Sequence, residues 1–259
     1  MSKIYEPQGR AREYSPLALN LYRGCTHGCT YCYVPKMFKR WNSDYDHAEC
    51  RPNADFAELE KSAKKMQGCN KQILFSFTGD PYPFADDTTR TALEIMNKYN
   101  HKVAILTKGG SRCLKDLDVF KAFGERIKVG ATLTFFDDEL SKKWEPGAAL
   151  PSERLGTLKI LHENGIKTWA SFEPVIDPGE AIKLIYKSHS YLDHIKIGKI
   201  NGDKEVDSKV DWAKFLGDVV ALCRSLKLKF YIKDSLKKYE KESGIVLSDN
   251  EKDMDYLNL

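Results

Sequence analysis

Residues 23–33 read Arg23-Gly24-Cys25-Thr26-His27-Gly28-Cys29-Thr30-Tyr31-Cys32-Tyr33, and this stretch decides how the rest of the chain is interpreted. Its cysteines follow the spacing C-x3-C-x2-C, so a single loop can wrap three thiolates around one centre. Gly24 and Gly28 allow the backbone conformations that such a wrap needs. Thiolates are the preferred protein ligands of iron–sulfur clusters and of zinc. The loop therefore predicts a metal centre.

The spacing favours an iron–sulfur cluster over two alternatives. A cubane held by three thiolates keeps one iron without a protein ligand, and an open coordination position is what a catalytic metal site requires. For structural zinc, His27 would be a fourth ligand, but it lies inside the first gap and would strain a tetrahedral site. Zinc ligands also usually come as two separated pairs, and no second pair is present. The third interpretation is that the thiols are buried and inert.

The chain has seven cysteines, and four of them, Cys50, Cys69, Cys113 and Cys223, are scattered. An odd number in a chain of this size does not indicate a disulfide framework. Because these four never form a short pair, we do not expect an auxiliary cluster. Cys223 lies on the apolar stripe of a predicted helix and is expected in the core. Cys113 begins a predicted helix, where a mildly acidic thiol is expected.

Length and composition fit a single barrel-sized domain over residues 1–259, with the barrel at about 16–232 and a C-terminal helix and acidic tail at 233–259. The net charge of +4 permits a nucleic-acid partner without arguing for one. No apolar run approaches the roughly 18–20 residues that span a bilayer. The N-terminus lacks the apolar stretch of a signal peptide. We therefore expect a cytoplasmic protein with no membrane partner.

Outward from the cysteines, short β-rich runs alternate with amphipathic helical patterns. The expected strands are 18–22, 73–77, 103–107, 127–134, 167–172, 194–200 and 230–232. The expected helices are a segment capped by Asn53 and running to Met66, then 85–99, 114–123, 152–164, 180–187 and 210–226. Regular alternation of this kind predicts an α/β fold with a parallel sheet, arranged as a partial (β/α)6 TIM-like barrel with outer helices.

Active sites of such folds lie at the carboxyl ends of the strands. Polar residues at these ends are Thr78, Gly79 and Asp80, then Thr107, Lys108 and Thr132, and finally Glu173, Lys199 and Asn201. Each also has an ordinary structural interpretation. Residues 78–81 would make a common turn, Lys108 a solvated lysine, and Thr132 a residue with high β propensity.

The cysteine spacing with the aromatic Tyr31 before the third cysteine resembles the signature of the radical S-adenosylmethionine (SAM) superfamily. Further motifs are similar to its spore photoproduct lyase-like group: the whole stretch 24–33, the turn Thr78-Gly79-Asp80-Pro81-Tyr82-Pro83, Thr107-Lys108-Gly109, and residues 132–137 followed by Glu145-Pro146 and Arg154. The resemblance runs from about Leu21 to Gly202. It implies a [4Fe–4S] cluster and SAM as cofactors, cleavage of SAM to a 5′-deoxyadenosyl radical, and an electron donor such as a flavodoxin or ferredoxin.

The resemblance also implies roles for particular residues. Cys25, Cys29 and Cys32 match the cluster ligands. Tyr31 matches the aromatic residue whose backbone lies near adenine, and Thr78, Gly79 and Asp80 match the segment near the amino group of SAM, where a carboxylate suits an ammonium. Lys108 matches a lysine near the SAM carboxylate, and Thr132 a hydroxyl residue near the ribose.

The roles of Glu145, Arg154, Glu173 and Lys199 stay open. For Glu145 and Arg154 an ion pair or cap is as good an interpretation as substrate contact. Lys36, Lys39, Arg40 and Trp41 form a basic and aromatic stretch after the cysteines that could contact phosphates and a base, although a solvated loop face is the favoured interpretation.

One departure limits the resemblance. Spore photoproduct lyase carries a cysteine on its second strand, next to the turn, where this chain has Phe77. We therefore do not expect thymine-dimer repair. The substrate is unknown, with a nucleic acid or nucleotide as the first candidate and a peptide or small molecule behind it. The rival hypothesis is a non-catalytic zinc- or cluster-stabilised binding module that recognises nucleic acid or a partner through its basic loop and the acidic residues Asp249, Glu251, Asp253 and Asp255.

Overall fold

A seven-stranded sheet forms the centre of the computed structural model, which describes residues 3–40 and 45–259. The strands are β1 (Leu17–Leu19), β4 (Gln72–Phe75), β5 (Lys102–Thr107), β6 (Ile127–Thr132), β7 (Lys167–Val175), β8 (His194–Lys199) and β9 (Lys229–Ile232), in this spatial order. Every neighbouring pair is parallel, so each connection must cross over a face of the sheet. This confirms the predicted α/β partial barrel. A small antiparallel pair, β2 (Tyr22–Arg23) and β3 (Arg51–Pro52), lies outside the sheet.

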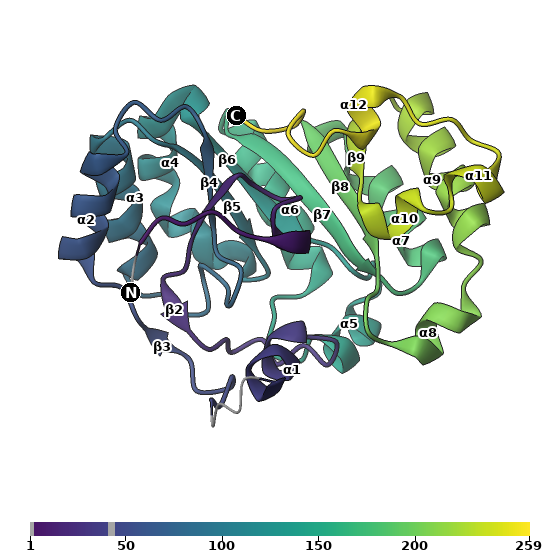
Figure 1. Ribbon diagram of the computed structural model, residues 1–259, viewed down its shortest axis with the longest axis horizontal. Helices are drawn as coiled ribbons and strands as arrows, with labels where there is room; N and C mark the ends of the chain where they lie inside the picture. Colours follow the sequence, from purple (N-terminus) through teal and green to yellow (C-terminus); the bar gives the residue numbers. More distant parts are fainter. Residues whose placement is uncertain (1–2, 41–44) are drawn as a thin grey trace.

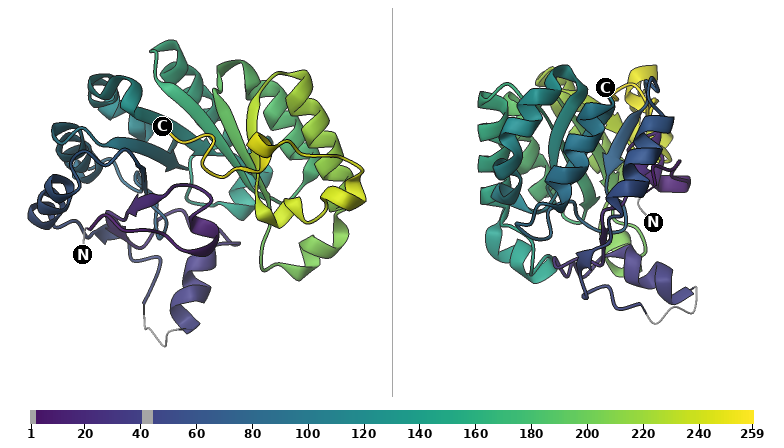
Figure 2. Two further views of the ribbon diagram at one scale, coloured as in Figure 1. Left: turned by 45° about the horizontal axis from the view of Figure 1, so that its top comes forward. Right: turned by 90° about the vertical axis from the view of Figure 1, so that its left-hand side faces the viewer.

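The crossover helices cover the outer face of the sheet (Figures 1 and 2). The helices are α1 (Tyr33–Arg40), α2 (Phe56–Lys65), α3 (Thr88–Lys98), α4 (Leu117–Phe123), α5 (Asp138–Trp144), α6 (Pro151–Glu163), α7 (Pro178–Ser188), α8 (Lys204–Lys209), α9 (Trp212–Ser225), α10 (Asp234–Lys237), α11 (Glu240–Ser243) and α12 (Asp249–Lys252). Short 3-10 turns are η1 (Gly9–Ala11), η2 (Gly110–Asp116), η3 (Gly124–Arg126) and η4 (His189–Tyr191). Within the described residues, none of the helices combines the length and apolarity that crossing a membrane would require.

Alternation along the strands separates an apolar outer face from a polar inner face. Outward-facing Ile105 and Phe172 belong to the two large hydrophobic clusters beneath the helices. Inward-facing Lys128 and Lys196 are buried, and Trp169 lies in a small separate cluster. At Gly130 a Cβ would come within 2.6 Å of the Trp169 ring, so glycine makes room for this indole. The inner face of the sheet therefore carries buried lysine side chains as well as apolar ones.

Both terminal segments of the described chain lie on the inner face (Figure 1). The Tyr231 hydroxyl of β9 donates to Glu13, 2.9 Å away. The ammonium of Lys196 donates to the main-chain carbonyls of Glu13 (2.6 Å) and Met254 (3.3 Å). Arg12 forms an ion pair with Asp255 at 2.6 Å. Residues 10–16 thus connect the β1 edge of the sheet to the β9 edge and close the open side of the partial barrel.

Several element boundaries differ from the sequence predictions. The expected strand 18–22 divides into β1 and β2, because the Asn20 side chain accepts hydrogen bonds from the amides of Phe77 and Thr78 and leaves the ladder. The strand expected at 127–134 ends at Thr132. The cap of α2 is Asp55, whose carboxylate accepts the Glu58 amide, and not Asn53. The helix expected at 85–99 begins at Thr88.

The C-terminal region was predicted as one helix and a tail, which is wrong. It forms the three short helices α10, α11 and α12. Gly244, with φ +69°, ends α11 in the left-handed conformation, and a capping box of Ser248 and Glu251 starts α12. The Glu251 carboxylate forms an ion pair with Arg224, and the Asp255 carboxylate forms one with Arg12, both within the same chain.

Candidate active site

The cysteine loop lies between β2 and α1, at the carboxyl edge of the sheet. Cys25, Cys29 and Cys32 are all free thiols and all partly exposed. The Cys25 amide donates to the His47 carbonyl (2.8 Å), and the Cys32 amide turns back to the Cys29 carbonyl (3.0 Å). Burial is the main reason that the pKa of Cys29 is raised, to about 11, while the nearby charge of Lys108 opposes the rise.

Close approaches of backbone hold this loop against two others. At Gly147 an added Cβ would lie 2.2 Å from the Thr26 carbonyl oxygen, and at Gly79 it would lie 2.7 Å from the Gly24 carbonyl oxygen. The Gly147 amide donates to the His27 carbonyl at 2.8 Å. The Thr26 hydroxyl reaches the Pro83 carbonyl at 3.1 Å. The cradle of the cysteine loop is therefore formed by residues 79–83, which the sequence placed among the site motifs, and by Gly147, which directly follows the motif Glu145-Pro146.

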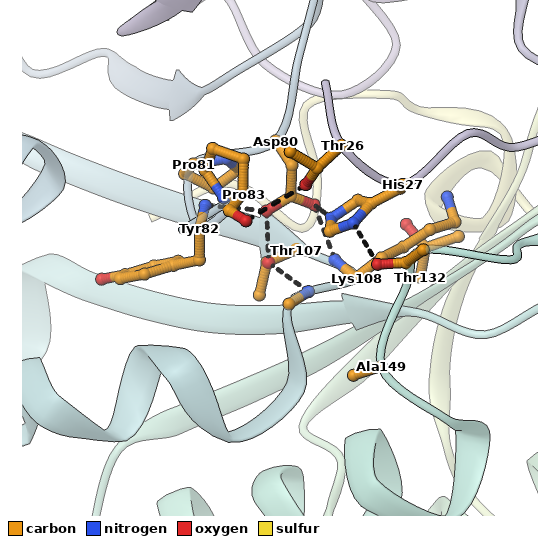
Figure 3. A network of polar contacts seen from close by, with 12 residues as sticks. Thr26, His27, Asp80, Pro81, Tyr82, Pro83, Thr107, Lys108, Thr132 and Ala149 are labelled. Atoms are coloured by element: carbon orange, nitrogen blue, oxygen red, sulfur yellow. Dashed lines mark hydrogen bonds and ion pairs between the residues drawn. The ribbon is translucent and has the colours of Figure 1, made fainter. Parts of the chain in front are cut away.

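Asp80 organises one side of this cradle (Figure 3). Its Oδ1 accepts from the Tyr82 amide (2.8 Å) and the Thr107 hydroxyl (2.6 Å), and its Oδ2 accepts from the Lys108 amide (2.7 Å). Burial alone would raise the pKa of Asp80, but the charge and hydrogen bonding of its neighbours outweigh burial and hold it well below the usual range. Asp80 thus joins the ends of β4 and β5.

His27 connects Asp80 to the cysteine loop. Its Nε2 lies 3.0 Å from Asp80 Oδ2, an ion-pair distance at which the N–H is poorly aligned for a hydrogen bond. Its Nδ1 lies 3.2 Å from the Gly147 carbonyl. Contacts to Asp80 and to the Gly147 carbonyl therefore give His27 a place in the cradle.

A second network surrounds Tyr31. Its hydroxyl donates to Glu145, which also forms a buried ion pair with Arg154 at 2.5 Å. Arg154 is fully buried and donates to the carbonyls of Ala149 (2.7 Å) and Thr132 (2.9 Å). Burial would raise the pKa of Glu145, but Arg154 and the other donors lower it. The ion pair and cap that the sequence left open for Glu145 and Arg154 are both present.

Lys108 lies between the two networks. Its main-chain amide donates to Asp80, and its ammonium lies 5.6 Å from the centre of the Tyr31 ring and 3.9 Å from Glu145. The side chain is 16% exposed, so the ammonium can still meet an anion from solvent. Thr132 is buried at the end of β6, whereas Thr78 is partly exposed. The structure therefore brings the predicted residues to one edge of the sheet.

Sequence reasoning missed a third polar group, on the inner face. The Tyr14 hydroxyl and the Lys233 ammonium both donate to Glu173, and the Tyr14 hydroxyl is also 2.9 Å from Ser171 Oγ. A Cβ at Gly198 would lie 2.8 Å from Glu173, so this glycine makes room for the pair. Glu173 was singled out as a strand-end residue. Tyr14 and Lys233 carried no sequence signal, because their partner is distant along the chain.

Other predicted residues have plainer surroundings. Lys199 forms an ion pair with Asp207. Lys36, Lys39 and Arg40 are exposed on α1, and Trp41 lies outside the described residues. Cys223 is buried in the core as predicted. The expected acidity of Cys113 is wrong, because its thiol is buried and burial raises its pKa to about 12.

The donor set fits an iron–sulfur cluster. Three partly exposed thiols on one loop, cradled by glycine contacts, leave room for a bulky inorganic group. Within residues 3–40 and 45–259, no group of three or more His, Cys, Asp or Glu side chains is arranged to hold a single metal ion. A cubane makes a different demand, because its three thiolates bind three different iron atoms.

Comparisons with known proteins give relatives by sequence. The uncharacterized protein MJ0683 of Methanocaldococcus jannaschii is 35% identical over 161 residues, which cover 61% of this chain and 60% of that protein. The uncharacterized protein ORF301 of Acidianus two-tailed virus is 28% identical over 174 residues, covering 63% of this chain and 57% of that protein. The chain thus spans less than two thirds of the length of these curated relatives.

Solved structures share the fold. Streptococcus suis SuiB bound to S-adenosylmethionine superposes with a TM-score of 0.66 at 14% identity, over 89% of this chain and 53% of that one. A spore photoproduct lyase variant with bound AdoMet and dinucleoside spore photoproduct gives 0.67 at 14% identity, over 89% and 78%. The sequence profile described as the radical SAM superfamily matches residues 19–188, from β1 to the end of α7 and across both polar networks. The chain belongs to the radical SAM superfamily, whose members hold a [4Fe–4S] cluster and SAM.

Proposed function

We propose that this radical SAM enzyme abstracts a hydrogen atom from a nucleotide or nucleic-acid substrate held over the inner face of its partial barrel. Three thiols in a loop that is tied to the ends of β4 and β5 carry the proposal. When bound, the cluster and SAM together supply a 5′-deoxyadenosyl radical. The electron comes from a donor such as a flavodoxin or ferredoxin.

In this proposal Cys25, Cys29 and Cys32 hold the cluster, and the neighbouring strand ends hold SAM. Asp80 already accepts hydrogen bonds from Tyr82, Thr107 and Lys108, and His27 lies 3.0 Å from its Oδ2. Asp80 therefore acts by fixing the turn 78–80, and the SAM ammonium meets polar groups of Thr78 and Gly79 on the cluster side of that turn. An ammonium that did bind Asp80 directly would have to displace one of these donors.

Lys108 and Tyr31 complete the proposed SAM contacts. The Lys108 ammonium is partly exposed and lies beside the ring of Tyr31, so it is placed to meet a carboxylate. Because the Tyr31 hydroxyl is bound to Glu145, the ring and the backbone around it are held in one orientation. Thr132, whose carbonyl accepts from Arg154, is fixed at the end of β6 for contact with the ribose.

Support for a nucleotide substrate comes from the fold neighbours and from charge. Spore photoproduct lyase binds a dinucleoside in its solved complex. In this chain Lys36, Lys39 and Arg40 are exposed on α1, directly after the cysteine loop. SuiB, a fold neighbour of nearly equal TM-score, has been solved with a precursor peptide, so a peptide is the second candidate. Phe77 in place of a thiol separates the reaction from thymine-dimer repair.

Deuterium transfer tests the proposal. Reconstituted protein is incubated without oxygen, with SAM, dithionite and substrates deuterated on sugar and base carbons. Mass spectrometry then measures deuterium in 5′-deoxyadenosine. Enrichment from a nucleotide and none from deuterated peptides supports the proposal. Enrichment from peptides alone reassigns the substrate. A colourless protein with stoichiometric zinc and no SAM binding supports the non-catalytic binding module instead.

A further inference from the structure

A cavity of about 360 Å³ opens at the carboxyl ends of β8 and β9. Its walls come from the loop after β8, from the first residues after β9 and from Arg10 in η1. Small-molecule sites usually occupy roughly 300–1,000 Å³, so this cavity can hold one small group. The cysteine loop follows β1 and β2, and β1 is the opposite edge strand of the sheet from β9.

The charges that line this cavity do not cancel. Asp207 forms an ion pair with Lys199, and Asp234 forms one with Lys237 at 2.9 Å. Neither Arg10 nor Lys238 forms an ion pair with a carboxylate in the part of the chain that the structure describes, and both side chains are exposed. Because each carboxylate already has a lysine partner, Arg10 and Lys238 leave the cavity lining with an excess of positive charge. The Lys238 ammonium lies 4.8 Å from the centre of the Tyr239 ring, and its charge helps to lower the pKa of Asp207.

Neutral hydrogen-bonding groups accompany these cations. Ser235 lines the cavity, and its hydroxyl oxygen is buried without a hydrogen-bond partner among the described residues. The amide of Asn201 donates to the Lys199 carbonyl at 3.0 Å, which fixes the loop after β8. An unpaired buried hydroxyl is costly unless a ligand or water completes it. Two cations without a carboxylate partner, beside such a hydroxyl, supply the charge and the hydrogen-bond donor that an oxyanion requires.

The cavity is connected to the inner face. Asn201 lies 3.5 Å from Glu173, which belongs to the Tyr14–Glu173–Lys233 group. In barrels of parallel strands and outer helices, phosphate groups often bind at the loops after the last two strands, while chemistry occurs over the barrel mouth. A ligand anchored here could therefore extend across the same carboxyl edge that carries the cysteine loop.

We propose that the cavity after β8 and β9 binds a phosphate group of the substrate, through Arg10, Lys238 and the Ser235 hydroxyl. The inference rests on the proposed function for the identity of the substrate as a nucleotide, whereas the anion chemistry stands on the cavity itself. The phosphate fixes one end of the substrate, and the sugar or base reaches the radical source at the cysteine loop.

Paired ligands that differ by one phosphate test the proposal. Isothermal titration of the reconstituted protein with SAM present compares uridine 5′-monophosphate with uridine, and a uridine dinucleotide tests an internucleotide phosphate. Inorganic phosphate serves as the minimal probe. The monophosphate is expected to bind at least tenfold more tightly than uridine. Because the contact is ionic, this preference should shrink as salt rises.

Variants identify the site. Arg10→Ala combined with Lys238→Ala should abolish the preference for the phosphate, and Arg10→Gln with Lys238→Gln should do so with less change of shape. Lys241→Ala, which removes an exposed charge from α11 outside the cavity, should leave the preference intact. Equal binding of uridine and its monophosphate overturns the proposal, as does a preference that both double variants retain.

The same proteins separate this inference from the proposed function. None of the substituted residues contacts the cysteine loop, so each variant should still form 5′-deoxyadenosine from SAM without substrate. If the wild type forms 5′-deoxyadenosine but shows no phosphate preference, only the phosphate site is refuted. If it prefers the phosphate but forms no 5′-deoxyadenosine, the proposed reaction fails and the anion site stands.

Discussion

Replacing Arg154 by methionine perturbs the most deeply buried ion pair beside the cysteine loop. The side chains of Arg154 and Glu145 are both 0% exposed. Methionine fills similar space, but it leaves the Glu145 carboxylate without its nearer, fully buried cation and the carbonyls of Thr132 and Ala149 without the Arg154 donor. Glu145 keeps hydrogen bonds from Tyr31, Thr134 and Ser141, so it stays in place as a buried charge whose remaining cation is Lys108, 3.9 Å away and partly exposed.

The expected cost follows from that charge. Removing one partner of a buried ion pair typically destabilises a protein by about 3–5 kcal/mol. For a chain of this size, each kcal/mol lowers the melting temperature by roughly 2–4 °C. Arg154→Met should therefore lower the melting temperature by on the order of 6–20 °C. Adding Glu145→Gln removes the stranded charge, so the double variant should be less destabilised than the sum of the two single variants.

Thermal and urea unfolding, both followed by circular dichroism on anaerobically reconstituted protein, measure the melting temperatures and the free energies of unfolding. Lys159→Met is the control, since Lys159 and Glu163 form a pair whose side chains are 64% and 58% exposed. That control should change the free energy of unfolding by less than about 0.5 kcal/mol. A cost of Arg154→Met as small as that of the control would refute the reasoning, and so would strict additivity in the double variant.

Three further predictions address the loop, SAM and pH. Gly147→Ala places a Cβ 2.2 Å from the Thr26 carbonyl oxygen and should lower the iron bound per chain. Gly156→Ala is the control, because its Cβ would meet no atom within 4 Å, and it should leave the iron content unchanged. Equal iron in both variants would contradict the role of Gly147 in holding the cysteine loop. Lys108→Met should weaken SAM binding about tenfold, because one charge-assisted hydrogen bond is lost, and equilibrium dialysis measures the affinity. An unchanged affinity would exclude a contact between Lys108 and the SAM carboxylate. Burial and the neighbouring Lys233 lower the pKa of Lys196 to about 7. Between this value and the unfolded value of about 10.4, the unfolded chain binds more protons. The free energy of unfolding should therefore rise with pH across that window, and Lys196→Met should flatten the rise. Identical pH profiles for the wild type and Lys196→Met would contradict this prediction.

The sequence was a good guide to the elements and to the centre of the site. Alternating runs predicted the parallel strands, since a buried strand must place apolar residues on the helix-covered face. The C-x3-C-x2-C spacing pointed directly to the proposed cluster ligands, because one loop carries all three cysteines. Glu145 and Arg154 were recognised as polar positions, and the structure shows the ion pair and the carbonyl cap that they form.

Contacts between distant segments could not be predicted in the same way. Asp80 is held by donors from residue 27 and from residues 107 and 108, and this set becomes visible only when β4 and β5 are paired. Tyr14 and Lys233 meet Glu173 because residues 10–16 cross to the β9 edge. Nothing local to these residues indicates that crossing.

Local sequence also misplaced several boundaries. Asn20 lies within an apolar run that predicts a continuous strand. Its side chain instead accepts hydrogen bonds from the amides of Phe77 and Thr78 in the turn after β4, and β1 ends before it. Cys113 begins a helical turn, but its burial outweighs any effect of that position on the thiol. In both cases a tertiary contact overrides a local preference.

The central claim is that Cys25, Cys29 and Cys32 hold a cluster that cleaves SAM reductively. The most direct measurement is 5′-deoxyadenosine formed without oxygen from SAM and dithionite by reconstituted wild-type protein and by Cys29→Ala, with Cys69→Ala as a matched control outside the loop. We expect product from the wild type and the control and none from Cys29→Ala. A fully loaded wild-type cluster that yields no 5′-deoxyadenosine, or an equal yield from Cys29→Ala, would contradict the account.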